Sequence, residues 1–209
     1  MNIIREENKG VLLELKEAKQ LDFWADVIPA RKIFILVSGR AGVGKSLVAN
    51  LIVNSLRDKG FKATQEGFAD AVKDAAIDYF GWNGEKDSSG RKLLQQIGNV
   101  GREYSKDTWV SQFVDKHAYD YSNGVVVVSD WRFPNELEYI EDSGFQILTI
   151  RVNAPERESL KGTEYYNDIS ETSLLDSDPE LYDYYIDNDQ SLTIEILKKE
   201  IENFIERYF

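Results

Sequence analysis

Short apolar runs alternate with longer amphipathic segments along most of this chain. The apolar runs predict β-strands over residues 33–37, 61–65, 125–129, 146–151 and 184–186. The segments between and after them predict helices over about 45–59, 69–80, 91–104, 107–121, 134–143 and 191–207. Because strands joined by helices run parallel, we expect an α/β fold, with a five-stranded, mostly parallel sheet flanked by helices. Ligands of such a fold bind at the carboxyl ends of the strands.

Two segments fall outside this alternation. Residues 1–30 carry apolar side chains at helical spacing and predict an N-terminal helical extension ahead of the main domain, 31–209. This extension either packs on the domain or joins two chains in a homodimer. Residues 153–180 show no clear periodicity. A long irregular stretch in a compact domain is typical of an active-site lid, which we expect over about 153–173.

A glycine-rich turn directly follows the first predicted strand and reads Gly39-Arg-Ala-Gly-Val-Gly44-Lys45-Ser46. Glycines let main-chain amides crowd a polyphosphate, the lysine supplies a cation, and the serine hydroxyl is a ligand for Mg²⁺. The following helix turns its partly positive N-terminus toward the same anion. The motif therefore predicts a phosphate-loop (P-loop) NTPase fold that binds ATP. The expected ATP-binding residues are Gly39, Ala41, Gly42, Val43, Gly44, Lys45, Ser46 and Leu47.

A carboxylate follows the most apolar of the predicted strands. The run 125–129 leads directly into Asp130, and phosphate-loop enzymes use a carboxylate in this place to hold a Mg²⁺-bound water. We therefore predict a metal site formed by Ser46 and Asp130. Arg132 lies two residues further on and reaches the same cleft, where a guanidinium can stabilise charge on a phosphoryl group in transfer.

Further cations are placed for an acceptor anion. Arg91 opens the predicted helix 91–104, and Arg102 lies 11 residues later on roughly the same helix face. Either arginine can serve the phosphate of an acceptor, and Arg91 is preferred because it follows a loop rich in Gly, Ser, Asp and Asn. Lys73 follows the second predicted strand and is placed for the same acceptor site.

Composition narrows the classes of function. The formal net charge of −12 argues against a nucleic-acid polymer as ligand, since such ligands favour a basic face. Residues 164–209 hold 13 acidic and 3 basic side chains, so the part that handles phosphate is nearly neutral. No apolar stretch approaches the roughly 20 residues that cross a bilayer, and an export signal is absent, so we expect a cytoplasmic protein without a membrane partner. The lack of cysteine excludes disulfides and thiolate metal sites, and the single histidine, His117, cannot form a zinc site by itself.

Several of these motifs together resemble the phage-type deoxynucleoside monophosphate kinases, which are phosphate-loop kinases related to adenylate and dephospho-coenzyme A kinases. The resemblance covers about residues 32–207. Beside the phosphate loop it rests on Phe68-Ala-Asp70-x-x-Lys73, Arg91-x-Leu-Leu-Gln95-x-Ile-Gly98, Ser129-Asp130-x-Arg132-Phe133-x-Asn135-Glu136 and Ser170-Glu171. It implies Mg²⁺- and ATP-dependent phosphorylation of deoxynucleoside 5′-monophosphates to diphosphates, in deoxynucleotide supply.

The motifs and the resemblance together imply a set of site residues. The expected catalytic residues are Lys45, Arg91, Asp130, Arg132 and, from the lid, Arg157. The expected substrate-binding residues are Asp70, Lys73, Arg91, Gln95 and Arg132. Two other functions fit the phosphate loop: a dephospho-coenzyme A kinase or other small-molecule kinase, and a non-catalytic nucleotide-binding switch. A switch of the GTPase type needs a guanine-reading Asn-Lys-x-Asp element, and the only Asn-Lys pair, at Asn8, precedes the loop.

Overall fold

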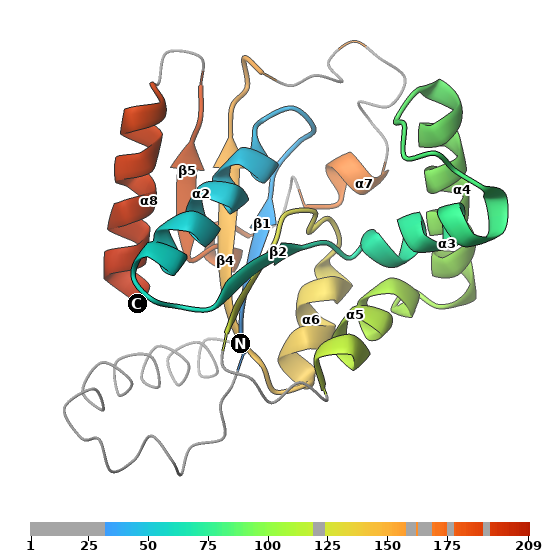
Figure 1. Ribbon diagram of the computed structural model, residues 1–209, viewed down its shortest axis with the longest axis horizontal. Coiled ribbons are helices and arrows are strands. Elements are labelled where there is room, and N and C mark those ends of the chain that lie inside the picture. Colours follow the sequence, from blue (N-terminus) through green and yellow to red (C-terminus); the bar gives the residue numbers. More distant parts are fainter. Residues whose placement is uncertain (1–31, 119–123, 158–161, 163–168, 175–177, 190–192) are drawn as a thin grey trace.

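A five-stranded parallel sheet forms the centre of the molecule (Figure 1). The computed structural model describes residues 32–118, 124–157, 162, 169–174, 178–189 and 193–209. The strands are β1 (Ile33–Ser38), β2 (Ala63–Glu66), β3 (Val125–Val128), β4 (Gln146–Asn153) and β5 (Tyr184–Asp187). They lie in the order β2-β3-β1-β4-β5, and each neighbouring pair is parallel. The predicted α/β fold class is confirmed, and this sheet is parallel throughout.

Helices cover both faces of the sheet. One face is covered by α2 (Lys45–Asp58) and α8 (Ile194–Tyr208), and the opposite face by α5 (Thr108–Ala118) and α6 (Pro134–Asp142). The helices α3 (Asp70–Phe80) and α4 (Ser88–Tyr104) lie to one side of this layer, next to α5 (Figure 1). No helix in these described segments is long and apolar enough to cross a membrane.

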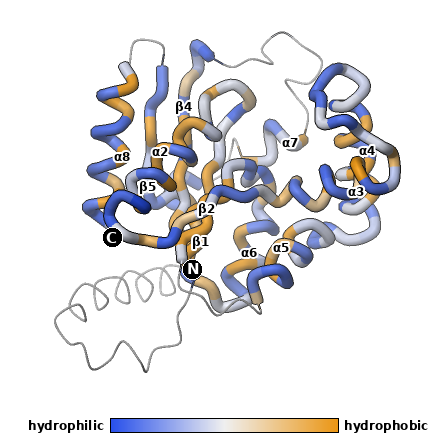
Figure 2. The backbone as a smooth tube through the Cα atoms, in the orientation of Figure 1, coloured by the Kyte–Doolittle hydropathy of each residue, from blue (hydrophilic) through white to orange (hydrophobic). Residues whose placement is uncertain are grey.

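The central strand explains why the apolar runs are continuous rather than alternating. Side chains of Ile35 and Val37 pack with α2 and α8, whereas Phe34 and Leu36 pack with α5 and α6. All four are fully buried, because a central parallel strand has helices on both faces. Figure 2 shows hydrophobic residues gathered in the central strands and hydrophobic and hydrophilic residues alternating along the helices.

In-register pairing brings three strand ends to one edge. Ile33 of β1 lies opposite Val125 of β3, and Ala63 of β2 lies opposite the same valine. The residues that follow β1, β2 and β3 therefore meet at the carboxyl edge of the sheet. That edge carries the glycine-rich turn and Asp130.

Two predicted segments differ from the structure in ways that matter for the site. The helix predicted from residue 91 begins at Ser88, because the Asp87 carboxylate accepts a hydrogen bond from Gly90 N at 2.7 Å and caps the helix. Arg91 therefore lies in the first turn of α4 rather than at its start. The stretch 153–180 is not wholly irregular, since it contains the short helix α7 (Ile169–Thr172) and the 3-10 helix η2 (Pro179–Leu181).

Four predictions lie at least partly outside the described residues. The N-terminal extension, 1–30, is wholly outside them. The end of the predicted helix 107–121 and the first two residues of the predicted helix 191–207 also lie outside them. Within the predicted lid, the same holds for residues 158–161 and 163–168.

Candidate functional site

The phosphate loop joins β1 to α2 and has a backbone that requires glycine. Gly39, Gly42 and Gly44 have φ angles of 147°, 88° and 95°, which other residues rarely adopt. A Cβ atom on Gly39 would lie 2.5 Å from the carbonyl oxygen of Val152, and one on Gly44 would overlap the side-chain amide of Asn188. Neighbouring segments therefore press closely on this loop and fix its shape, as a preformed phosphate cradle requires.

Lys45 is a buried cation at the start of α2. Its side chain donates hydrogen bonds to the carbonyl oxygens of Gly39 at 2.7 Å and Arg40 at 2.8 Å. Burial lowers the pKa of Lys45 to about 8, and the nearby charges of Arg132 and Arg151 act in the same direction. An anion at the loop would restore the ordinary pKa of this lysine.

Asp130 binds the turn between β2 and α3. Its two carboxylate oxygens accept hydrogen bonds from Phe68 N at 2.9 Å and Ala69 N at 3.0 Å. Burial raises the pKa of Asp130, while these two bonds and Arg132 oppose the rise. A Cβ atom on Gly67 would lie 2.6 Å from Asp130 Oδ2, so this turn also needs glycine. Each carboxylate oxygen keeps acceptor capacity, and the predicted metal role of Asp130 stays a prediction.

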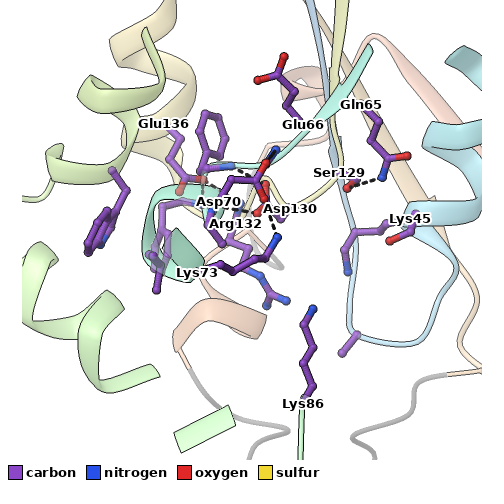
Figure 3. A pocket seen from close by; sticks show the side chains of 18 of the residues that line it. Lys45, Gln65, Glu66, Asp70, Lys73, Lys86, Ser129, Asp130, Arg132 and Glu136 are labelled. Carbon is purple, nitrogen blue, oxygen red and sulfur yellow. Dashed lines mark hydrogen bonds and ion pairs between the residues drawn. The ribbon is translucent and has the colours of Figure 1, made fainter. Parts of the chain in front are cut away.

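A cleft of about 720 Å³ opens between the phosphate loop and the α3–α4 region. Figure 3 shows the cationic ends of Lys45, Lys86 and Arg132 turned toward one space. The predicted site residues that line the cleft are Ala41, Gly42, Lys45, Ser46, Asp70, Lys73, Asp130 and Arg132. Those that do not line it are Gly39, Val43, Gly44, Leu47, Arg91, Gln95 and Arg157. The loop and the residues after β2 and β3 thus share one cavity.

Of the two arginines on α4, the structure turns Arg102 and not Arg91 toward this cleft. Arg91 is exposed, and its Nε donates to Lys86 O at 2.9 Å. The guanidinium of Arg102 lies 5.0 Å from the ring centre of Phe133 and donates to Asn99 Oδ1 at 2.8 Å. The geometry therefore favours Arg102 for the acceptor site, whereas the sequence favoured Arg91.

The wall opposite the phosphate loop combines a cation with aromatic rings. Lys73 Nζ donates to Asp70 Oδ1 at 2.6 Å, and the other oxygen of this carboxylate accepts from Gly67 N at 2.8 Å. Trp109 and Phe133 line the same cavity and are only partly buried. Sequence reasoning could not separate these two aromatic residues from those of the core.

Glu136 is a site residue to which sequence reasoning gave no role. It lines the cleft, and its Oε2 accepts hydrogen bonds from Arg132 N at 2.9 Å and Phe133 N at 3.0 Å. Burial raises the pKa of Glu136 to about 8. The sequence did contain a signal for this role of Glu136. A proline followed two residues later by glutamate, as in Pro134 and Glu136, is typical of a helix N-terminus. Glu136 fixes the turn that carries Arg132.

Arg157 lies on the other side of the phosphate loop. Its guanidinium donates to Asn188 Oδ1 at 3.4 Å and to Asp189 O at 3.0 Å. Asn188 is 2% exposed, and its amide donates to Val43 O at 2.8 Å. The turn after β5 thus connects the base of the predicted lid to the phosphate loop.

The short helix α7, which lies within the predicted lid, contacts the same loop. Glu171 accepts a hydrogen bond from Ala41 N at 2.7 Å through Oε2 and a short ion-pair contact from Arg132 Nη1 through Oε1. Its side chain is 5% exposed. The phosphate loop, α7 and the segment after β3 are therefore joined through one carboxylate.

Comparison with known proteins gives likenesses at the level of structure. No protein-family model matches the chain, and neither does any curated protein sequence. An APS kinase of Mycobacterium tuberculosis in complex with AMPPNP and APS is 14% identical, with a TM-score of 0.46, over 86% of this chain and 98% of its own. A gluconokinase of Sinorhizobium meliloti is 16% identical (TM-score 0.39; 87% and 98% covered), and a shikimate kinase of Aquifex aeolicus is 14% identical (TM-score 0.40; 83% and 96% covered).

Proposed function

We propose that this protein is a kinase that transfers a phosphoryl group from ATP to a deoxynucleoside 5′-monophosphate. One observation carries the proposal: the phosphate loop with Lys45 forms one wall of a cleft whose other walls bring Lys73, Lys86 and Arg102 to the same space. A triphosphate donor and an acceptor with its own phosphate need two cationic regions facing each other in one cavity.

The character of the cleft supports a nucleotide acceptor. Its volume of about 720 Å³ lies within the range of about 300–1,000 Å³ that is typical of small-molecule sites. Trp109 and Phe133 offer ring faces on which a base can stack. The deoxynucleotide class itself rests on the resemblance of the sequence motifs.

The phosphate loop and Asp130 together hold the donor. Amides of the loop and Lys45 bind the β- and γ-phosphates, and Ser46 with Asp130 would hold Mg²⁺, which neutralises phosphate charge when bound. Among the described segments, no group of three or more His, Asp or Glu side chains could hold a metal ion. This fits Mg²⁺ that arrives with the triphosphate and takes most of its ligands from phosphate and water.

The acceptor phosphate needs no strong base, since it is already an anionic nucleophile. One of its oxygens forms a bond to the γ-phosphorus while the bond from that phosphorus to the β,γ-bridging oxygen breaks, and ADP leaves with the bonding electrons. Arg132 lines the cleft between the two anions and stabilises the charge spread over the moving group. Arg102 and Lys73 hold the acceptor.

The test is ADP release from ATP and Mg²⁺ with dAMP, dCMP, dGMP or dTMP as acceptor, measured in a coupled assay. Dephospho-coenzyme A and pantetheine serve as alternative acceptors. We expect release that depends on a deoxynucleoside monophosphate and is lost in Lys45→Ala. Lys59→Ala, at the exposed C-terminal cap of α2, is the matched control. Release with only the pantetheine compounds, or release independent of any acceptor, would contradict the proposal.

A further inference from the structure

The contact between α7 and the phosphate loop joins parts that are distant in the chain. Glu171 is separated by 130 residues from Ala41 and by 39 from Arg132, and its carboxylate binds both. The same Arg132 Nη1 also donates to the Ser170 carbonyl at 2.9 Å, while Ser173 Oγ donates to Arg132 O at 2.7 Å. The side chain of Arg132 is therefore held by α7, and its main chain by Ser173, the residue that follows α7.

The contact leaves Arg132 facing the reaction space. Its side-chain hydrogen bonds to Ser170 and Glu171 come from Nη1, and the guanidinium still lines the cleft. Arginine has five N–H donors in a fixed fork, so anchoring one nitrogen orients the rest. By binding Nη1, the Glu171 carboxylate therefore sets the direction in which the rest of the Arg132 guanidinium points.

The negative charge of Glu171 also offsets the positive charges beside the phosphate loop. Lys45 lies in the field of Arg132 and Arg151, which both lower its pKa, whereas the carboxylates of Glu171 and, to a smaller extent, Asp130 raise it. Without a buried negative charge, three cations would repel one another beside the phosphate loop. Glu171 is 5% exposed and Arg132 is 29% exposed, so this pair is shielded from water more than a surface ion pair.

We propose that Glu171 is a positioning residue, which holds the Arg132 guanidinium against the phosphate loop so that it meets the phosphoryl group during transfer. The inference rests on the proposed kinase function and adds a residue to it. Glu171 acts through Arg132 and contacts no substrate itself. Its bond to the Ala41 amide fixes the distance between the arginine and the loop that holds the donor.

Replacing Glu171 by glutamine tests whether this carboxylate anchors Arg132. Glu171 uses both oxygens as acceptors, toward Ala41 N and Arg132 Nη1. Glutamine has a single acceptor oxygen, so one of these donors would face an NH₂ group. Glu171→Gln therefore keeps the side-chain volume but loses one anchor and the charge. The matched control is Glu180→Gln, an exposed glutamate of η2.

The experiment compares kcat for the best acceptor with the affinity for AMPPNP, measured by calorimetry, in wild type, Glu171→Gln and Glu180→Gln. We expect kcat of Glu171→Gln to fall about tenfold to a hundredfold, as for misplaced catalytic groups, with AMPPNP affinity changed less than about threefold. Arg132→Gln and the double variant complete a cycle. Once Arg132 is absent, Glu171→Gln should lower the residual rate no further.

Each other outcome overturns the inference. Unchanged kcat in Glu171→Gln would show that Arg132 needs no anchor. Tighter AMPPNP binding without loss of rate would show a carboxylate that competes with the triphosphate for Ala41 N. A full further loss in the Arg132→Gln background would show that Glu171 acts by another route. A wild-type protein inactive with every acceptor would refute the kinase function as well, whereas the first three outcomes require an active wild type.

Discussion

Replacing Arg102 by glutamine should damage use of the acceptor far more than binding of the donor. Arg102 lines the cleft, on the α4 side away from the phosphate loop. A hydrogen bond between an arginine and a phosphate contributes about 1.5–3 kcal/mol, since both groups are charged. With 1.36 kcal/mol for each factor of ten, the loss corresponds to about a 10- to 150-fold lower kcat/KM for the monophosphate. The KM for ATP should change little.

The assay is steady-state kinetics with the acceptor varied at saturating ATP, and Arg91→Gln is the control. Arg91 is exposed and its Nε donates to the Lys86 carbonyl, so its replacement should alter kcat/KM by about twofold or less. The thermal midpoint must be measured too, because Arg102 lies over Phe133 and this contact contributes about 1 kcal/mol or less. A larger acceptor defect in Arg91→Gln than in Arg102→Gln would refute the reasoning from the geometry of the cleft.

Three further predictions concern Lys45, Glu136 and Asn188. Burial lowers the pKa of Lys45 to about 8, so the protein should take up about half a proton when it binds AMPPNP at pH 8. This uptake is measured as a calorimetric binding enthalpy that depends on the buffer. The same uptake in Lys45→Met would show that Lys45 is not the group that takes up the proton. Burial raises the pKa of Glu136 from 4.5 to about 8, so the native state holds a proton that the unfolded chain releases, and stability should fall as pH rises between these values. Urea unfolding at pH 5 and pH 8 should show that Glu136→Gln removes this fall, which between these two pH values is at most about 4 kcal/mol; an equal fall in the variant would exclude Glu136 as its source. Asn188→Ala leaves the Val43 carbonyl without its amide partner and should lower the free energy of unfolding by about 1–3 kcal/mol; an unchanged thermal midpoint would count against that bond.

Much of the fold could be predicted because its signals are local. Each predicted strand is present within a few residues of its expected bounds, and a left-handed glycine precedes Lys45 at the start of α2. Even the misplaced start of α4 had a local signal, since Asp87 is a favoured N-cap residue. The order of the strands across the sheet, by contrast, depends on which apolar faces pack together.

The roles of distant residues could not be read from the sequence. Arg91 and Arg102 share a helix face, but 11 residues separate them by about 16 Å along the axis, so they cannot both reach one phosphate. Only the packing of α4 against its neighbours selects Arg102. Likewise, the bond from Ala41 N to Glu171 spans 130 residues and leaves no periodic trace.

The sequence by itself determined the phosphate loop, the strand and helix order and the amino acids available for chemistry, because backbone preferences and apolar periodicity act over a few residues. The tertiary structure alone decided which cations face the cleft, that Asp130 binds the β2–α3 turn, and that Glu171 joins Arg132 to the phosphate loop. These contacts depend on the packing of whole elements in space, to which residues throughout the chain contribute together.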